Sequence, residues 1–251
     1  MTWVELDGAV NVRDVGGLPT VDGRTTRPGV LLRSDNLQAL SGRDVAHLVD
    51  DLGLRTVLDL RTDGEVELEG PGPLRSRPEV AHHHLSLIPH GFEGRAAVAR
   101  AIPDEDAPEH SMSHFYVDYL KDAPDSIATA LRLLATPASR LSLVHCAAGK
   151  DRTGVVVAVA LSLAGVTRDA VVADYARSAE RIAQVRDRLV ASSTYTADVS
   201  ARTLDSMTPH AHNMQRFLDA VDRDYGGPHG LAMSVGVDEE TVDRLRARLL
   251  R

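Results

Sequence analysis

The chain has 251 residues, with 28 Lys and Arg against 36 Asp and Glu, so its formal net charge is −8 at pH 7. It therefore lacks the basic footprint that nucleic-acid binding needs, and nucleic acid is excluded as a default partner. No apolar run reaches the roughly 18–20 residues of a membrane span, which excludes stable membrane insertion. Hydrophobic residues make up 43% of the chain, and without repeats or composition shifts this length predicts a single domain over 1–251.

The sequence contains one cysteine, Cys146, so an intramolecular disulfide is excluded. Unpaired thiols are typical of reducing compartments, and the N-terminal stretch lacks the basic-then-apolar pattern of a secretory signal. We therefore expect a cytoplasmic protein, with leaderless export left open. A lone cysteine in an intracellular protein is also a candidate nucleophile.

Short β-rich runs alternate with helical stretches in the first half of the chain. Paired glycines indicate a turn, and a serine before an amphipathic stretch indicates a helix cap. In chain order we expect a turn at 16–17, a strand at 30–33, a helix from Ser41 to about 51, strands at 55–60 and 79–87, and a variable loop at 89–108.

The second half is mostly helical around one further strand. We expect helices at 113–120 and 125–134, a strand at 141–146, a helix from 155 that is buried on all sides, a helix at 167–179, a more polar helical stretch at 180–205, a helix opened by Pro209 through 222, and a last helix capped by Asp238. Strands that alternate with helices predict an α/β fold with a central, mostly parallel sheet and helices on both faces.

Residues 145–154 read HCAAGKDRTG, between the strand at 141–146 and the buried helix. Cys146 leaves the sheet at its carboxyl edge, where open α/β sheets bind ligands. The backbone amides of residues 147–152 can converge on one anion at the start of the helix, and Gly149 permits the sharp bend. This pattern predicts an anion-binding loop in which Ala147, Ala148, Gly149 and Lys150 cradle a phosphate group.

The loop also carries the groups needed for covalent catalysis. The field of the amides favours the thiolate form of Cys146, and Arg152 can bind two phosphate oxygens with its planar fork. Thr153 can donate its hydroxyl to the sulfur. Attack of the thiolate on a phosphoryl group gives a cysteinyl-phosphate that water hydrolyses. The amides and Arg152 neutralise the phosphoryl oxygens, so we expect neither a metal nor another cofactor.

The Cys146-x5-Arg152 spacing is the signature of cysteine-dependent phosphatases, and other stretches extend the resemblance. The chain resembles the atypical bacterial tyrosine and lipid phosphatases, the family of mycobacterial protein tyrosine phosphatase B. It contains, in the order seen in that family, residues 11–17 (NVRDVGG), Arg33-Ser34, residues 59–62 with Glu65, Tyr225-Gly226-Gly227 and Gly236-Val237. The resemblance implies the cysteine phosphatase fold, phosphotyrosine as substrate, phosphoserine, phosphothreonine or phosphoinositides as further substrates, and inorganic phosphate as product. It also implies a mobile two-helix lid, which we place at 180–205 because this stretch is polar and shows no core periodicity.

Two charged residues distinguish this loop from those of tyrosine-specific relatives. Lys150 is similar to the lysine of phosphoinositide phosphatases, where it adds positive charge for a phosphorylated head group, although it could instead be a solvated surface lysine. Asp151 resembles the aspartate of myotubularin-type loops and is our first choice for the general acid. Alternatively, Asp151 only complements the dipole at the helix N-terminus.

Asp59 and Arg61 lie at the carboxyl end of the strand at 55–60 and therefore at the same sheet edge as Cys146. We expect them to border the pocket, with Asp59 orienting Lys150 or Arg152 or serving as the acid. A strand-end aspartate that caps a turn is the simpler alternative. We expect Arg13 and Asp14 to form a structural ion pair near the site.

Two other readings of the sequence remain at this point. A non-catalytic phospho-ligand binder would require a damaged loop, and a rhodanese-type sulfur transferase would not be expected to pair the cysteine with Arg-Thr-Gly. The run His82-His83-His84 does not predict a metal site, because consecutive residues on a strand point to opposite faces.

Overall fold

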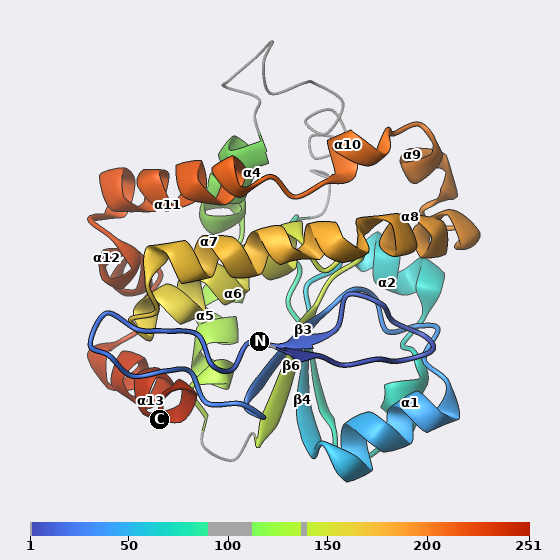
Figure 1. Cartoon of the computed structure of the whole chain (residues 1–251), viewed down its shortest axis with the longest axis horizontal. Coiled ribbons are helices and arrows are strands. Elements are labelled where there is room, and N and C mark those ends of the chain that lie inside the picture. Colours follow the sequence, from blue (N-terminus) through green and yellow to red (C-terminus); the bar gives the residue numbers. More distant parts are fainter. Residues whose placement is uncertain (1, 90–111, 137–139) are drawn as a thin grey trace.

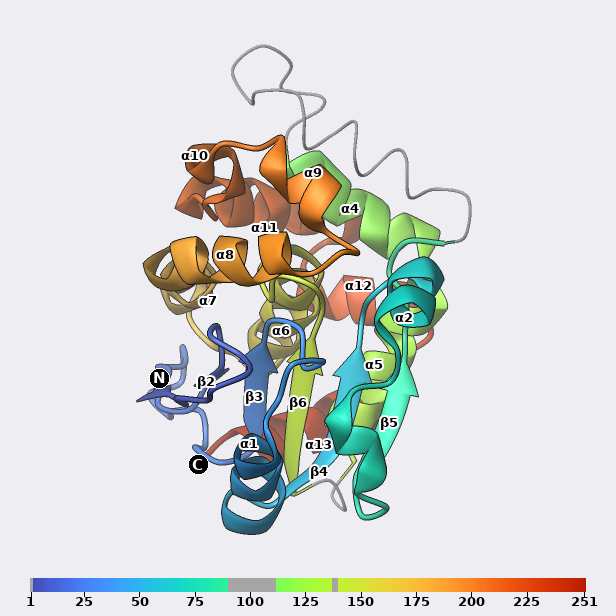
Figure 2. The ribbon, with the colours of Figure 1, turned by 90° about the vertical axis from the view of Figure 1, so that its right-hand side faces the viewer.

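The computed structural model describes residues 2–89, 112–136 and 140–251, and in this part of the chain one mixed sheet organises the fold (Figures 1 and 2). Its strand order is β1-β2-β3-β6-β4-β5. The strands are β1 (Thr2–Trp3), β2 (Arg13–Asp14), β3 (Leu31–Ser34), β4 (Leu54–Asp59), β5 (Ala81–His84) and β6 (Leu141–His145). The pairs formed by β3, β6, β4 and β5 are parallel, and β1 and β2 add antiparallel pairs at one edge.

Helices cover both faces of this sheet, which confirms the predicted fold class (Figure 2). Successive strand residues point to opposite faces, so Val57 packs into one apolar cluster and Leu58 into the other. The smaller cluster lies under α1 (Gly42–Ala46), the π-helical turn η1 (His47–Asp51) and η2 (Pro73–Ser76). The larger cluster lies under α5 (Pro124–Leu134), α6 (Asp151–Leu163) and α13 (Glu239–Leu249).

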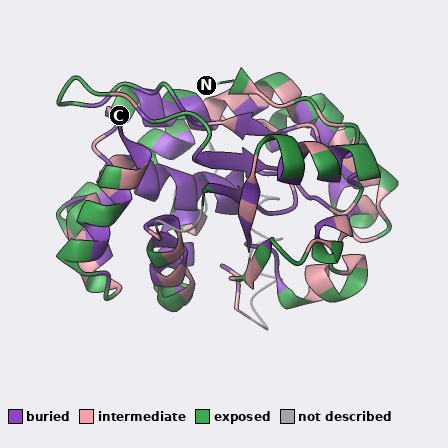
Figure 3. Ribbon diagram, turned by 90° about the horizontal axis from the view of Figure 1, so that it is seen from below, coloured by how far each residue is buried: buried purple, intermediate pink, exposed green. Residues whose placement is uncertain are grey.

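The helix α6 is buried around its whole circumference, as its uniform Val, Ala and Leu content predicts. Besides β6, it contacts α4 (Met112–Asp122), α5, α7 (Arg168–Ala176), α12 (Pro228–Ser234) and α13, and α11 (Ala211–Tyr225) packs on α4 and α7. Figure 3 shows the result as a buried centre with the exposed residues on the outer helices and loops. The loop that precedes α6 is therefore anchored at one end to the central sheet and at the other to the most buried helix.

Side-chain caps set several helix starts. Ser41 forms the predicted cap, in a capping box with Asp44, and Asp238 caps α13 by accepting from Thr241 N. A second capping box, between Thr62 and Glu65, starts α2 (Asp63–Glu69), a helix that the sequence analysis did not predict.

One sequence prediction differs from the structure, and another concerns residues outside the described ranges. Pro209 does not lie in the first turn of a helix, because α11 begins at Ala211 after His210 as its N-cap residue. The predicted variable loop at 89–108 falls, except for residue 89, outside the described residues.

The segment that follows α7 crosses the carboxyl ends of the parallel strands (Figures 1 and 2). It comprises η4 (Arg177–Arg181), α8 (Ile182–Ala191), α9 (Thr196–Ser200) and α10 (Leu204–Met207). The expected absence of core periodicity was wrong, because Ile182, Val185 and Leu189 recur on one face of α8 and pack with Ala147. None of the described helices has the length and apolar character that crossing a membrane would require.

Candidate active site

The loop between β6 and α6 has a backbone shape that only glycine permits at its centre. Gly149 has φ +69°, and a Cβ atom there would lie 2.4 Å from Ser34 O and 2.5 Å from Asp35 N. Both contacts are with backbone atoms at the end of β3, which have no side-chain freedom to move aside. Gly149 therefore allows the sharp bend and the close approach of two backbone segments at once.

The carbonyl groups of this loop are held from outside. Three successive carbonyl oxygens each accept one hydrogen bond: Ala147 from Asn36 N at 3.0 Å, Ala148 from Asn11 Nδ2 at 3.0 Å, and Gly149 from Arg33 Nη2 at 2.9 Å. In a trans peptide the C=O and the following N–H point in opposite directions. The amides of residues 148–150 therefore point to the interior of the loop, as an anion-binding nest requires.

Two of these donors, Asn11 and Arg33, belong to a buried polar group that we call the loop cradle: Asn11, Arg13, Arg33, Asp174 and Ser178, each at most 1% exposed. Asp174 on α7 accepts from Arg13 Nε at 3.0 Å and from Arg33 Nη1 at 2.5 Å. Burial opposes ionisation of Asp174, but the two guanidinium charges outweigh it and lower its pKa. Burial lowers the pKa of Arg13 to about 10.

The predicted ion pair between Arg13 and Asp14 is wrong. Arg13 reaches inward to Asp174, Asn11 and Ser178, whereas Asp14 accepts from Gly16 N at 2.7 Å and Gly29 N at 2.6 Å. Consecutive strand residues point to opposite sides, so one joins the cradle and the other closes a turn.

Cys146 and Arg152 lie at the two ends of the loop, and both are buried. Arg152 binds Glu65 in a fork, Nη1 to Oε2 at 2.5 Å and Nη2 to Oε1 at 2.9 Å, and Nη1 also reaches Leu60 O at 3.3 Å. Burial opposes the charge on Arg152, but Glu65 outweighs it and raises the pKa of the guanidinium. Arg152 Nε is buried and has no hydrogen-bond partner in the structure.

Glu65 therefore holds the arginine, a role that the sequence analysis did not assign. The signal was present, because Thr62 and Glu65 have capping-box spacing, and that box orients the carboxylate through a 2.6 Å hydrogen bond from Thr62 N. The predicted hydrogen bond from Thr153 to the sulfur is wrong, since Thr153 Oγ1 is buried without a partner.

Lys150 and Asp151 form the last turn of the loop and the start of α6. Lys150 is 5% exposed, which argues against a solvated surface lysine, and its Nζ lies 3.6 Å from Asp151 Oδ2. Asp151 Oδ1 accepts from the Tyr116 hydroxyl at 2.5 Å. The carboxylate therefore has one oxygen toward a buried tyrosine of α4 and the other toward the lysine of the loop.

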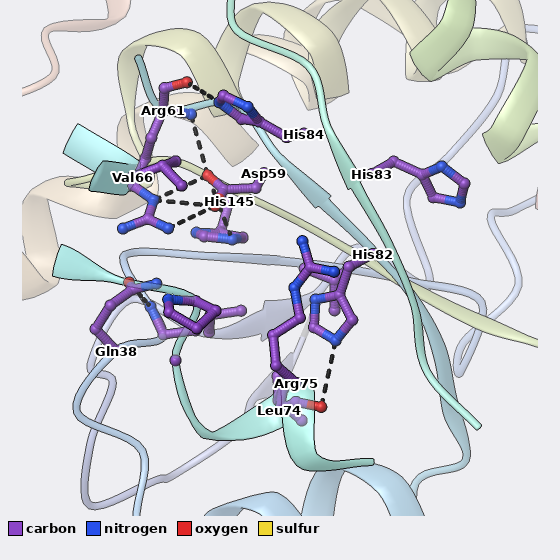
Figure 4. A pocket seen from close by; sticks show the side chains of 14 residues that line it. Gln38, Asp59, Arg61, Val66, Leu74, Arg75, His82, His83, His84 and His145 are labelled. Carbon is purple, nitrogen blue, oxygen red and sulfur yellow. Dashed lines mark hydrogen bonds and ion pairs between the residues drawn. The ribbon is translucent and has the colours of Figure 1, made fainter. Parts of the chain in front are cut away.

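Asp59 and Arg61 lie beside the loop and pair with each other, as Figure 4 shows. Asp59 accepts from Arg61 Nη2 at 2.6 Å and Nε at 2.9 Å, and its Oδ1 lies 3.6 Å from His145 Nε2. The structure thus pairs Asp59 with Arg61, where we expected it to orient Lys150 or Arg152. Burial opposes its ionisation, but His145 and Arg61 outweigh burial and lower the pKa of Asp59 far below its usual value. Such a carboxylate stays ionised, which does not suit an acid.

Asp59, Arg61 and His145 also line a cavity of about 120 Å³ next to the loop, together with residues of η2 and β5 (Figure 4). His82 and His84 contact backbone carbonyls there, of Leu74 at 3.3 Å and Arg61 at 2.8 Å, while His83 lies apart from them. Within the described ranges, no three His, Cys, Asp or Glu side chains gather closely enough to hold a metal ion.

The helices α8–α10 meet the loop through a small apolar cluster and a few polar contacts. Ile182, Val185 and Leu189 pack with Ala147, and Arg188 forms an ion pair with the buried Asp35. Tyr195, between α8 and α9, is also buried in this cluster, and burial together with the charge of Glu65 raises its pKa. The segment predicted as a lid therefore covers the loop and has a tyrosine near the residue that holds Arg152.

The amides of this loop face inward at a sheet edge, with a cysteine at one end of the loop and a clamped arginine at the other. This arrangement suits thiolate attack on a bound phosphoryl group. The protein class that this arrangement defines is the cysteine-dependent phosphatases. A model of the tyrosine phosphatase family matches residues 4–251, and the chain belongs to that family.

Two relatives found by sequence agree with this assignment. The chain is 32% identical to the triple specificity protein phosphatase PtpB of Mycobacterium tuberculosis, over an alignment of 279 positions that covers 98% of each chain. It is 29% identical to a tyrosine-protein phosphatase of Nostoc commune, over 79% of this chain and 67% of the relative. Among solved structures, the core catalytic domain of SIW14 from S. cerevisiae aligns with a TM-score of 0.40 and 16% identity, covering 89% of this chain and 96% of that one.

Proposed function

We propose that this phosphatase hydrolyses phosphotyrosine, and also phosphoserine, phosphothreonine and phosphoinositides, as one phosphatase domain acting in the cytoplasm. The observation that carries the proposal is the outward hydrogen bonding of three loop carbonyls, because it turns the intervening amides toward one anion. The similarity to a triple specificity phosphatase supports the breadth of substrates, and the single free thiol is consistent with a reducing compartment.

In the first step we assign the attack to Cys146. Its thiolate forms an S–P bond while the bond from phosphorus to the ester oxygen breaks, and Asp151 gives its proton to that leaving oxygen. The products are the free alcohol, the cysteinyl-phosphate and ionised Asp151. Arg152 binds the phosphoryl oxygens through Nε, the buried donor without a partner, and through the second hydrogen of Nη2.

In the second step water replaces the thiolate. Ionised Asp151 takes a proton from the water as its oxygen attacks phosphorus, the S–P bond breaks, and inorganic phosphate leaves. The thiolate and the protonated aspartate are both regenerated, so the cycle consumes only water and ester. Neither step requires a metal in this scheme, because the amides and Arg152 neutralise the phosphoryl charge.

We assign Lys150 to substrates that carry more than one phosphate. Its side chain is 7% exposed and lies at the loop beside Asp151, so it adds a positive charge that is only weakly screened by solvent. A phosphoinositide head group gains more from this charge than a phosphotyrosine side chain does. Arg61 adds less, because Asp59 neutralises it.

The test is a substrate panel of phosphotyrosine, phosphoserine and phosphothreonine peptides and phosphoinositides with the wild type, Cys146→Ser and Lys150→Met. Cys146→Ser should lose turnover and keep phosphate binding. Lys150→Met should reduce kcat/KM for phosphoinositides by about tenfold more than for phosphotyrosine, from the loss of one charge–charge contact. Equal losses of kcat/KM for the two substrate classes would contradict the assigned role of Lys150. A serine variant that turns over at the wild-type rate would contradict the covalent mechanism.

The assignment of the acid has its own test. A general acid contributes about 10²–10⁴ in rate, and alkyl leaving groups need it more than p-nitrophenolate. We therefore expect Asp151→Asn to lower kcat/KM for O-phosphoserine far more than for p-nitrophenyl phosphate. If Asp59→Asn shows this dependence and Asp151→Asn does not, Asp59 is the acid.

A further inference from the structure

Two buried tyrosine hydroxyls form a hydrogen-bonded chain that ends on Asp151. Tyr116 of α4 contacts Asp151 Oδ1 at 2.5 Å, and its oxygen lies 2.7 Å from the hydroxyl of Tyr175 on α7. The two tyrosines are 0% and 1% exposed. Burial and the charge of Asp151 raise the pKa of Tyr116, so its hydroxyl keeps its proton.

The hydrogen bonds along this chain all run in one direction, toward Asp151. A tyrosine hydroxyl has one hydrogen, and Tyr116 directs its hydrogen to Asp151 Oδ1, so Tyr175 is the donor in the contact between the two hydroxyls. Tyr175 therefore donates a hydrogen bond to Tyr116, and Tyr116 donates one to Asp151. Asp151 Oδ1 is therefore the terminal acceptor of a chain in which each donor is used.

We propose that Tyr116, supported by Tyr175, is a positioning residue that directs the acidic proton of Asp151 to Oδ2. A protonated carboxyl group carries its hydrogen on one oxygen, and Oδ1 already accepts from Tyr116. The proton consequently resides on Oδ2, the oxygen that faces Lys150 of the phosphate-binding loop at 3.6 Å. This inference rests on the proposed role of Asp151 as the acid.

The chain acts without losing or gaining a proton. As the ester bond breaks, the Oδ2 proton of Asp151 passes to the leaving oxygen, and Tyr116 still donates to Oδ1 of the carboxylate that remains. Without this donor, the carboxyl group can exchange its two oxygens by rotation, and fewer molecules present the proton to the ester. Loss of the correct orientation of a catalytic group lowers the rate even when the group itself is retained.

Tyr116→Phe tests the proposal, because it removes one hydroxyl and keeps the ring in the core. We expect kcat/KM for O-phosphoserine to fall by about tenfold or more, and that for p-nitrophenyl phosphate to change by less than about threefold. The basic limb of the pH profile should move to higher pH, because the ionised form of Asp151 loses a hydrogen-bond donor. Tyr225→Phe, near the end of α11, is the matched control and should change neither substrate.

The decisive comparison repeats Tyr116→Phe in an Asp151→Asn background, where we expect no further loss on O-phosphoserine. A further loss there, or equal losses on both substrates in the single variant, would make Tyr116 merely structural and overturn the proposal. If Asp151→Asn alone shows no leaving-group dependence, the assignment of the acid fails, which is a distinct outcome. Should Tyr116→Phe not fold, Tyr175→Phe removes the supporting hydroxyl without touching Asp151. A smaller loss restricted to O-phosphoserine would support the chain, and its absence would contradict it.

Discussion

The phosphate-binding loop and the segment over it meet at Ala147 but are held in different ways. Each of three successive loop carbonyls is bound from outside, and the cradle behind them is almost inaccessible to water. The overlying segment, residues 180–205, has a small apolar cluster of its own, and several of its polar contacts reach exposed side chains. We therefore expect the loop to act as a rigid, preorganised anion site and the segment above it to be the element that opens.

We infer separate tasks for the two regions. A preorganised loop stabilises the phosphoryl charge without reorganising during the reaction. A cover that opens at low cost admits substrate and releases phosphate, and closing it excludes water.

The largest effect should come from Asp174→Asn. It leaves Arg13 and Arg33 buried without their counter-charge, and breaking such a buried ion pair costs about 3–5 kcal/mol. Urea unfolding at pH 7 measures the loss of free energy of unfolding. Asp198→Asn, which breaks an exposed pair with Arg202, is the control and should change this free energy by less than about 0.5 kcal/mol. Equal effects of the two variants would contradict the structural role of the cradle.

The same pair gives a pH dependence with a definite sign. The pKa of Asp174 is lower in the folded state than its usual value, so its contribution to stability is complete above that usual value. It is lost as the pH falls from the usual value toward the folded one. The free energy of unfolding should therefore drop more steeply below about pH 4 in the wild type than in Asp174→Asn. Parallel curves for the two proteins would show that Asp174 does not titrate in this way.

A smaller effect should follow from Asn11→Ala. The variant removes the donor to Ala148 O, and a buried acceptor left without its partner costs about 1–3 kcal/mol. Because that carbonyl holds the next amide toward the anion, phosphate affinity should fall together with stability. Isothermal titration with phosphate or vanadate measures this affinity. Weaker stability with unchanged affinity would separate the cradle from the anion site.

The last prediction changes no residue and concerns hydrogen exchange of the backbone amides in the unmodified protein. We expect amides of residues 182–200 to exchange at least about tenfold faster than those of 155–163, which lie in the fully buried α6. Phosphate or vanadate should slow the exchange of the first set. Equal protection in the two sets, with and without ligand, would remove the assignment of this segment as a mobile lid.

Local patterns allowed much of the fold to be predicted. The strand, loop and helix around Cys146 lie within one short stretch, and the caps at Ser41 and Asp238 depend on residues three positions apart. The strands β1 and β2 have two residues each, which is too short for an alternating pattern to show.

The supporting contacts of the site could not be predicted in this way, because they join distant parts of the chain. Arg13 and Asp174 are 161 residues apart, and Glu65 and Arg152 are 87 apart. Tyr116 reaches Asp151 across 35 residues from another helix. The sequence thus predicts candidate residues for the chemistry, while the tertiary structure determines which residues lie against them.

The central claim is that Cys146 forms the covalent intermediate and Asp151 serves both steps. The most direct measurement is rapid quenching of Asp151→Asn with p-nitrophenyl phosphate, followed by mass spectrometry of the peptide that contains Cys146. Since this leaving group needs little protonation, the first step should proceed while the second, which needs the base, is slow. We predict a burst of p-nitrophenol and one phosphoryl group on Cys146, both absent in Cys146→Ser. Continued turnover with an unmodified cysteine would contradict the account.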